Sequence, residues 1–423
     1  MSEDFMHYLW QFRLYQPGLY TTTQGESLEI IHPGIPNTNS GPDFFNAKIK
    51  IDGTLWAGNV ELHLKASDWF RHHHETDKAY NNVILHVILE NDDIAITASG
   101  RPPVAWQMPI EETMRNKYLQ LYFSSDWVAC APHLQNLSAF NLSIWLERIL
   151  VEKLEYKMKR IDALLHSTQN NWDEVFFILL CRNFGFGING DPFERLARNT
   201  PWTIIQKNRD DIIRLESLFL GQAGFLSNLI EEDEYTAILS REYKILTNKY
   251  NLKAIEPHHW KFMRLRPSNF PTIRLMQLAA LFHRGTLTLD KVLTAETVEQ
   301  LTAITEVPLS GYWQNHYRPN VNSKKTIKNL GKNSRQLIVI NTLVPISFAY
   351  GRYHDQQSLC QKVLQWLYLL PPEQNALISR WQKQGIQPIN AAQTQALVHL
   401  KQAYCQHKKC LHCKIGHIVL SKS

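Results

Sequence analysis

The sequence predicts an α/β + α protein, with an α/β domain over residues 1–130, a mostly α-helical domain over 131–400 and a Cys/His-rich tail over 401–423. In the first part, apolar residues alternate with polar ones, as half-buried strands require. From Ser138 onwards the apolar residues recur at helical spacing. In the tail, three of the six cysteines lie between residues 405 and 413. We place the first boundary near Trp127–Asn136, where a proline interrupts the pattern.

The N-terminal elements follow from these periods. Residues 4–12 predict a short aromatic helix, and residues 27–32 a strand that enters a Gly/Pro/Asn loop. Ala47, Ile49 and Ile51 predict the next strand, and Asp52-Gly53 predicts a tight turn into its hairpin partner. In that partner Glu61, His63 and Lys65 share one face. Residues 68–82 predict a helix, and residues 83–89 a buried strand.

The second part of the chain predicts amphipathic helices of irregular length. Their expected ranges are 138–166, 172–183, 201–220, 233–250, 270–284, 289–305 and 356–370. Because no fixed period relates these segments, we do not expect a solenoid of identical repeats.

Positive charge is concentrated in two acid-free stretches, residues 257–289 and 307–354, although the net charge is only +6. Such stretches suit a polyanion such as nucleic acid, and a solvated positive face is the alternative. No apolar stretch approaches the roughly 20 residues that cross a bilayer, and the first residues are acidic, unlike a secretory signal. We therefore expect a cytoplasmic protein without a membrane partner.

Four residues of the hairpin predict a catalytic site. Asp43 precedes one strand, and Glu61, His63 and Lys65 follow on one face of the next. Two carboxylates on adjacent strands suit Mg²⁺ or Mn²⁺, which take oxygen ligands. His63 or Lys65 would activate or orient a water for hydrolysis of a phosphodiester.

At these residues the sequence resembles the PD-(D/E)xK phosphodiesterase superfamily. Pro42-Asp43 matches its proline-aspartate signature, and Glu61 matches the acidic residue of its second motif. The resemblance implies a restriction-endonuclease-like αβββαβ core, and a metal held by the two carboxylates and the backbone carbonyl of Leu62. The departure is His63, which stands where the superfamily has lysine, with Lys65 two residues further along.

The whole chain also resembles an uncharacterised bacterial family of unknown function. This resemblance is carried by residues 41–44, 60–63 and 264–271 and by the Cys-rich end, and it implies no activity.

Further residues are candidates for contacts to substrate. In the expected helix over 68–82, which also carries His72 and His74, helical spacing would place His73, Asp77 and Tyr80 on one side. Arg264 and Arg266 precede a proline turn and offer planar forks for a phosphate. A solvated helix face and a structural turn are the alternatives. His86 is a core histidine or a support for the site.

The tail predicts a second metal site. Cys405, Cys410, Cys413 and His417 have the short spacing of a tetrahedral Zn²⁺ site. Alternatively, the three cysteines join Cys130 around an iron-sulfur cluster, as in some nucleases of the same superfamily, or the tail is reduced and binds no metal.

Together these features predict a metal-dependent nuclease, with DNA favoured over RNA as its substrate and the choice between them left open by the sequence. One alternative is a nucleic-acid-binding or scaffold protein with a degraded nuclease site. Another is that the helical part is a protein-interaction module.

Overall fold

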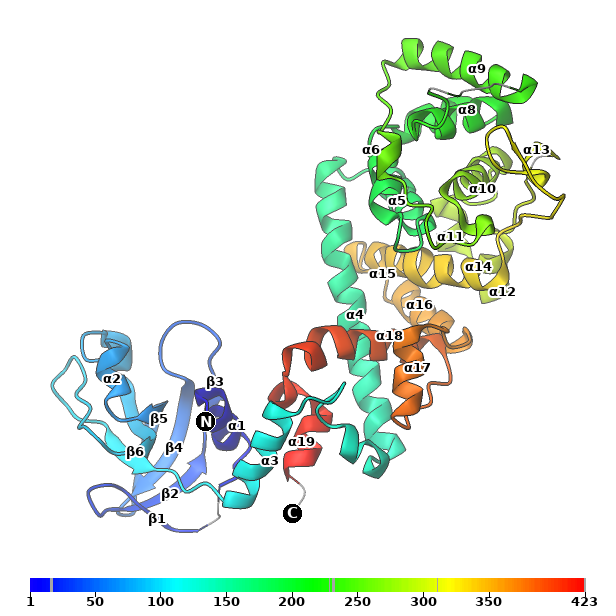
Figure 1. Ribbon diagram of the computed structural model, residues 1–423. Helices are drawn as coiled ribbons and strands as arrows, with labels where there is room; N and C mark the ends of the chain where they lie inside the picture. The colour runs from blue at the N-terminus through cyan, green and yellow to red at the C-terminus, as the bar shows by residue number, and fades with distance from the viewer. Residues whose placement is uncertain (16–17, 228, 230–232, 310, 422–423) are drawn as a thin grey trace. The chain divides into compact units, whose positions relative to one another are not determined.

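The computed structural model describes residues 1–15, 18–227, 229, 233–309 and 311–421. The chain forms two compact units (Figure 1). The first comprises residues 1–142 and 400–423, and the second comprises residues 143–399. The fold is therefore mixed α/β followed by α, and the C-terminal tail belongs to the first unit rather than forming a separate body.

A mixed sheet forms the centre of the first unit. Its strands are β1 (Tyr20–Thr21), β2 (Ser27–His32), β3 (Ile35–Pro36), β4 (Phe44–Ile51), β5 (Thr54–Lys65), β6 (Val83–Glu90) and β7 (Val104–Gln107). The order is β1-β2-β4-β5-β6-β7, and β3 pairs with β4. β4 and β5 are antiparallel, whereas β5, β6 and β7 run parallel.

The β4–β5 hairpin carries the candidate site and forms as its sequence predicts. Asp52 and Gly53 both have positive φ, of 45° and 79°, as a two-residue turn of this type requires. At the far end of the hairpin the register shifts between Phe44 and Ala47, where Asn46 has a φ of 57°. This bulge re-aims the start of β4 next to the centre of β5.

Where it carries Glu61 and His63, β5 is buried on both faces. β6 lies beside it in the sheet as a parallel neighbour, and further segments cover its faces. On one side lies α1 (Glu3–Gln11), whose Trp10 is fully buried and donates from Nε1 to the carbonyl of Pro33 at 2.9 Å. α2 (Asp68–Arg71) also packs against β5. Figure 1 shows both helices beside the sheet.

The helix expected over residues 68–82 was wrong in extent. α2 ends at Arg71, because His73 adopts a left-handed conformation with a φ of 63°. The chain then forms a loop, and Asp77 caps the short 3₁₀ helix η1 (Lys78–Asn82) by accepting from the amide of Ala79. His73, Asp77 and Tyr80 therefore do not share one helix face.

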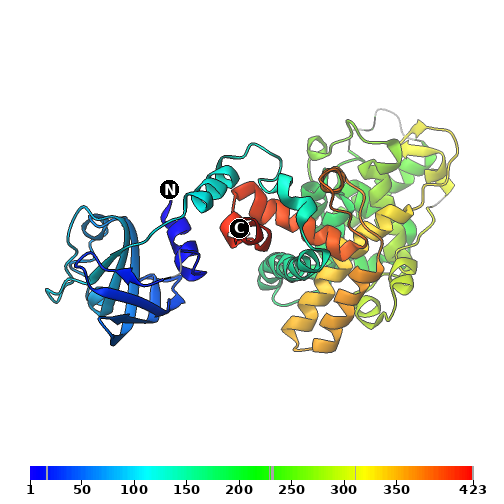
Figure 2. The ribbon, with the colours of Figure 1, turned by 90° about the horizontal axis from the view of Figure 1, so that it is seen from below.

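The last part of the first unit joins both ends of the chain. α3 (Glu112–Phe123) and η2 (Ala131–Asn136) precede the second unit. After it come η6 (Leu400–Tyr404), η7 (Cys405–His407), η8 (Cys410–His412) and α19 (Lys414–Ser421). α19, in red, packs beside α3, in cyan (Figures 1 and 2). Lys408 Nζ also donates to the carbonyl of Tyr122 at 2.6 Å, which ties the tail to α3.

The second unit is almost entirely helical. Its helices are α4 (Ala139–Ser167), which begins in the first unit, α5 (Trp172–Phe184), α6 (Gly190–Arg198), α7 (Trp202–Asn208), α8 (Ile212–Gln222), α9 (Glu234–Tyr250), η3 (Pro257–His259), η4 (Pro267–Asn269), α10 (Pro271–Arg284), α11 (Leu289–Thr294), α12 (Val298–Ala303), α13 (Gly311–Gln314), α14 (Lys332–Ile338), η5 (Val339–Leu343), α15 (Val344–Tyr353), α16 (Gln357–Leu369), α17 (Ala376–Lys383) and α18 (Ala391–His399). A small hairpin of β8 (His316–Arg318) and β9 (Val321–Asn322) lies among them.

Two helices expected as continuous are each divided in two. The expected helix over 201–220 breaks where Asp211 accepts from the amides of Ile213 and Arg214 and so starts α8. The expected helix over 289–305 breaks at Thr297, which forms a capping box with Gln300 and starts α12. In both cases an apolar period runs through a capping residue that begins a new helix.

Candidate functional site

Asp43 and Glu61 meet because of the register of the hairpin. Phe44 pairs with Val60, so Asp43 at the start of β4 lies opposite Glu61 in β5. The amide of Asp43 donates to Glu61 Oε2, and the amide of Leu62 donates to Asp43 Oδ2, both at 3.0 Å. These reciprocal bonds fix two carboxylates side by side. Burial, and then the charge of Asp43, raise the pKa of Glu61 well above its usual range.

α1 adds two further ionisable groups to the carboxylates. His7 Nε2 lies 3.0 Å from Asp43 Oδ2. Burial opposes charge on His7, yet the hydrogen bond to Asp43 and the charge of Asp43 raise the pKa of His7. Glu3 lies one turn earlier on the same helix, and its buried Oε1 has no hydrogen-bond partner among the described residues.

A cluster of four histidines covers the other side of Glu61. His63 Nε2 lies 3.6 Å and His74 Nε2 lies 3.2 Å from Glu61 Oε1. His63 Nε2 lies 3.1 Å from His72 Nδ1, and His63 Nδ1 lies 2.9 Å from His86 Nε2. His63, His74 and His86 are buried, whereas His72 is exposed. Burial, and then the neighbouring imidazoles, lower the pKa of His63.

The predicted hairpin residues do not all face this site. Lys65 lies at the exposed end of β5 and pairs with Glu90 at 2.9 Å. The side chain of His73 is 82% exposed and points to Glu75 at 3.9 Å. Asp77 is a capping residue of η1. Tyr80, in contrast, is buried and stacks on His74 with ring centroids 3.8 Å apart, so it supports the histidine cluster.

The two predicted arginines lie in the second unit. Arg264 and Arg266 are exposed in the segment that leads into α10. Not all of the predicted basic stretch is accessible: Lys328 is buried, and its Nζ donates to the carbonyls of Trp313 at 2.8 Å and Gln314 at 2.6 Å. Arg335 pairs with Glu306 at 3.0 Å. The surface available to a polyanion is therefore smaller than the sequence predicts.

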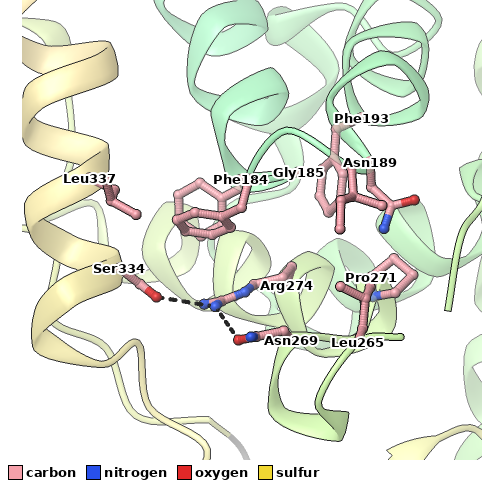
Figure 3. A pocket seen from close by; sticks show the side chains of 12 residues that line it. Phe184, Gly185, Asn189, Phe193, Leu265, Asn269, Pro271, Arg274, Ser334 and Leu337 are labelled. Carbon is pink, nitrogen blue, oxygen red and sulfur yellow. Dashed lines mark hydrogen bonds between the residues drawn. The ribbon is translucent and has the colours of Figure 1, made fainter. Parts of the chain in front are cut away.

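Next to this segment the second unit contains a cavity of about 290 Å³ (Figure 3). Aromatic and aliphatic side chains form most of its wall, including Phe184, Phe193 and Leu337. Arg274, from the first turn of α10, reaches the same cavity and is only 5% exposed. Sequence analysis did not single out this arginine, because it lies within an apolar helical pattern.

Cys130 lies with the three cysteines of the tail. Burial raises the pKa values of Cys130, Cys405 and Cys410, and neighbouring thiols add to the shift, including Cys413 in all three cases. The structure has no disulfide among the residues that it describes. His417, the fourth predicted ligand, instead places Nδ1 2.9 Å from the hydroxyl of Tyr8. A further thiol near the tail therefore comes from Cys130, far away in the sequence.

The profile of a family described as "Protein of unknown function (DUF2851)" matches residues 3–376. The chain belongs to this family. No curated protein and no solved structure matches it. The matched range covers both the hairpin site and most of the helical unit. The candidate site therefore lies in the part of the chain that defines the family.

Four histidines were absent from the predicted catalytic and metal residues: His7, His72, His74 and His86. The run of three histidines at residues 72–74 was visible in the sequence, but a continuous helix would have spread its members around the axis. Because His73 is left-handed, its own side chain faces solvent, whereas the side chains of His72 and His74 lie in the cluster. Finally, none of the helices in the described part of this family member has the length and apolar character that a membrane crossing requires.

Proposed function

We propose that this protein is a metal-dependent phosphodiesterase that acts on nucleic acid. The observation that carries the proposal is the reciprocal pair of hydrogen bonds that holds Asp43 and Glu61 side by side. In each bond, of 3.0 Å, a backbone amide of one strand donates to a carboxylate oxygen of the other. A buried carboxylate such as Glu61 and a half-buried one such as Asp43 repel each other unless a cation or a proton lies between them. Their order along the chain agrees with the PD-(D/E)xK resemblance.

A divalent cation fits the donor set of this site. Asp43, Glu61 and the imidazole of His63 would hold it, because carboxylate oxygens and neutral imidazole nitrogens are both metal ligands. When bound, such an ion neutralises phosphoryl charge and makes a coordinated water more acidic. Mg²⁺ and Mn²⁺ are the ions that the sequence predicts.

The side chains around the carboxylates have separate roles in this proposal. His63, rather than Lys65, takes the place of the lysine of the superfamily, because Lys65 is engaged by Glu90 at 2.9 Å. His7 lies 3.0 Å from Asp43 Oδ2 and, when protonated, would place positive charge where the phosphoryl group becomes more negative. Asp43 holds His7 in this orientation through its Oδ2 atom.

The exposed arginines support nucleic acid as the substrate. Arg264 and Arg266 are exposed and have no acidic neighbours in the sequence, and their guanidinium groups would suit phosphate contacts. The salt dependence of binding is the slope of the logarithm of the binding constant against the logarithm of the salt concentration. Each phosphate contact that is lost should reduce the magnitude of this slope by about one. Replacement of both arginines by alanine should therefore reduce that slope by about two.

The experiment is an incubation of labelled single- and double-stranded DNA and RNA with Mg²⁺, Mn²⁺ or EDTA. Wild type should cleave at least one substrate in metal and none in EDTA, and Glu61→Gln should be inactive. Glu90→Gln is the matched control, since Glu90 is a carboxylate on the neighbouring strand that faces Lys65. Equal cleavage by wild type and Glu61→Gln would contradict the proposal.

The same assay tests the non-catalytic alternative. A nucleic-acid-binding protein with a degraded site would bind in EDTA, lose affinity steeply with salt and never cleave. The two basic stretches of the helical unit favour this alternative equally well, so cleavage rather than binding decides.

We also propose that the tail cysteines hold a structural metal with Cys130. Four sulfur ligands suit Zn²⁺ or an iron-sulfur cluster. Gly416 allows α19 to pack closely against the turn that carries Cys410. A Cβ at this position would collide with the carbonyl of Cys410 and push α19 away from that turn. Zinc and iron analysis of the purified protein, with an absorption spectrum, distinguishes Zn²⁺, a cluster and a metal-free tail.

A further inference from the structure

We propose that His63, His72 and His74, together with Glu61, bind a first-row transition-metal ion of the Zn²⁺ type. Among the residues that the structure describes, the ligand atoms of these three histidines all lie within 4.8 Å of one another. The inference deepens the proposed function, because it names the class of ion at the same site and adds His72 and His74 to its ligands.

The spacing of the ligand atoms fits a tetrahedral site. Zn–N bonds of about 2.0–2.1 Å place neighbouring ligands of a tetrahedron about 3.3 Å apart. The structure has 3.1 Å between His63 Nε2 and His72 Nδ1, 3.6 Å between His63 Nε2 and Glu61 Oε1, and 3.2 Å between His74 Nε2 and Glu61 Oε1. Three nitrogens therefore lie within 4.8 Å of one another, and Glu61 Oε1 approaches two of them, those of His63 and His74.

The partners of these histidines orient them as metal ligands. His63 Nδ1 bonds His86 Nε2 at 2.9 Å, which leaves His63 Nε2 facing Glu61. His86 is completely buried and lies in contact with the ring of Trp69, 5.1 Å between centroids. His74 stacks on Tyr80. Such outer contacts fix the ring orientation of a ligating histidine.

The site has a buried side and an open side. His63, His74 and Glu61 are buried, whereas His72 is exposed. An ion could therefore enter from the side of His72, and substrate could approach it there. An accessible edge is typical of catalytic rather than closed structural sites.

The donor atoms discriminate between classes of ion. Mg²⁺ prefers oxygen ligands and retains its waters. Imidazoles favour Zn²⁺ and other transition metals. Because three of the four donors are imidazoles, this part of the site selects transition metals over Mg²⁺. The histidine at position 63 thus changes the type of metal rather than merely replacing a lysine.

The test is Co²⁺ titration of the full-length protein after removal of metals. Tetrahedral Co²⁺ bound by nitrogen and oxygen shows ligand-field absorption without the strong thiolate charge-transfer bands that the cysteine site would give. His72→Ala should weaken this nitrogen/oxygen-type binding by more than about tenfold. Because His72 is exposed, the variant should keep its fold, which circular dichroism verifies.

His73→Asn is the matched control. It removes a histidine from the same turn, its side chain faces solvent, and asparagine tolerates the positive φ of this position. His74→Gln gives a second, independent variant. The inference is overturned when His72→Ala and His74→Gln both bind Co²⁺ as wild type does, or when only thiolate-type spectra are observed.

The outcomes separate this inference from the proposed function. Cleavage of nucleic acid in Mg²⁺ that is unchanged in His72→Ala would leave the phosphodiesterase standing and remove the histidine site. Binding of Co²⁺ that requires His72, without cleavage of any nucleic acid, would do the reverse.

A second inference rests on Arg274, independently of the metal site. We infer that its guanidinium marks a binding site for an oxyanion in the cavity of the second unit. Arg274 donates to Asn269 Oδ1 at 2.6 Å and Ser334 Oγ at 3.2 Å (Figure 3). It also donates to Gln277 Oε1 at 2.9 Å, and all three acceptors are neutral. Its buried Nε has no partner, and no carboxylate pairs with its guanidinium among the described residues.

Buried charges are normally paired, because their removal from water is costly. Here the counterpart is missing, and the guanidinium borders an apolar cavity of about 290 Å³. The ligand class that satisfies both features is a small molecule with a carboxylate or phosphoryl group and an apolar body. The ring centroid of Phe186 lies 4.4 Å from the guanidinium carbon of Arg274, so this ring packs against one face of the guanidinium.

Benzoate and inorganic phosphate are the probes, and isothermal calorimetry with thermal unfolding is the readout. At least one probe should bind wild type and the control variant Arg241→Met, in which an exposed arginine of α9 is removed. Binding should be at least tenfold weaker in Arg274→Lys, because lysine lacks the planar fork. No binding to wild type, or equal binding to all three proteins, overturns the inference.

Discussion

Replacement of Glu61 by glutamine should remove metal-dependent stability without damage to the fold. Glutamine has the same shape, and its carbonyl oxygen can accept from the amide of Asp43 as Glu61 Oε2 does at 3.0 Å. Its amide nitrogen would then face the nitrogens of His74 and His63, at the positions that lie 3.2 and 3.6 Å from Glu61 Oε1. Neutral imidazole nitrogens accept hydrogen bonds, so no buried polar group is orphaned.

The size of the effect follows from linkage. An ion at a hundred times its dissociation constant stabilises the folded state by about 2.7 kcal/mol. If loss of the carboxylate weakens binding about a hundredfold, the same concentration contributes only about 0.4 kcal/mol. Wild type should therefore gain roughly 2 kcal/mol more from metal than Glu61→Gln does.

Hydrogen exchange of the amides in β5 is the appropriate assay, because it reports stability at the site and is not averaged over two units. Metal should slow exchange of β5 in wild type and leave it nearly unchanged in Glu61→Gln. Equal protection of β5 by metal in both proteins would refute the reasoning, since Glu61 would then not be a ligand.

Three further predictions concern other parts of the molecule. Cys130→Ser should lose the metal of the tail, as measured by elemental analysis, whereas Cys181→Ser, which alters a buried cysteine of α5, should retain it. His63→Ala should abolish cleavage and Lys65→Ala should not, and a reversed outcome in kinetic assays would restore the lysine as the catalytic group. Glu194→Gln should destabilise the second unit by about 1 kcal/mol in denaturant titrations at neutral pH, since it removes the buried carboxylate that pairs with the half-buried Arg182 and the exposed Arg198. Burial opposes ionisation of Glu194, but its arginines hold its pKa below the usual value, so this difference should vanish as the pH falls through the acid range.

The hairpin and the acidic pair were the parts of the fold most readily predicted from sequence. Alternation of apolar residues between Ala47 and Ile51, with Asp52-Gly53 after them, specifies the strands, the turn and hence the register. Register alone brings Asp43 opposite Glu61. Local rules therefore suffice here, because every contact involved lies within one hairpin.

The histidine cluster was not predictable in the same way. Its geometry depends on the left-handed backbone of His73, which ends α2 early, and no periodic pattern reports such a turn. Likewise, the approach of Cys130 to the tail depends on contacts between segments that are far apart in the chain. The break before α8 was encoded locally by Asp211, but the continuous apolar period outweighed it in the sequence interpretation.

The position of His63 connects these observations. A charged lysine at this position could donate a hydrogen bond to His86, but it has no lone pair to offer a metal. Histidine offers both, with one nitrogen to His86 at 2.9 Å and the other toward Glu61 and His72. His63 is accompanied by two further imidazoles, those of His72 and His74, whose ligand atoms lie within 4.8 Å of its own and of each other. A single histidine in the place of a lysine would leave their convergence unexplained, whereas the proposed site of imidazole ligands accounts for all three.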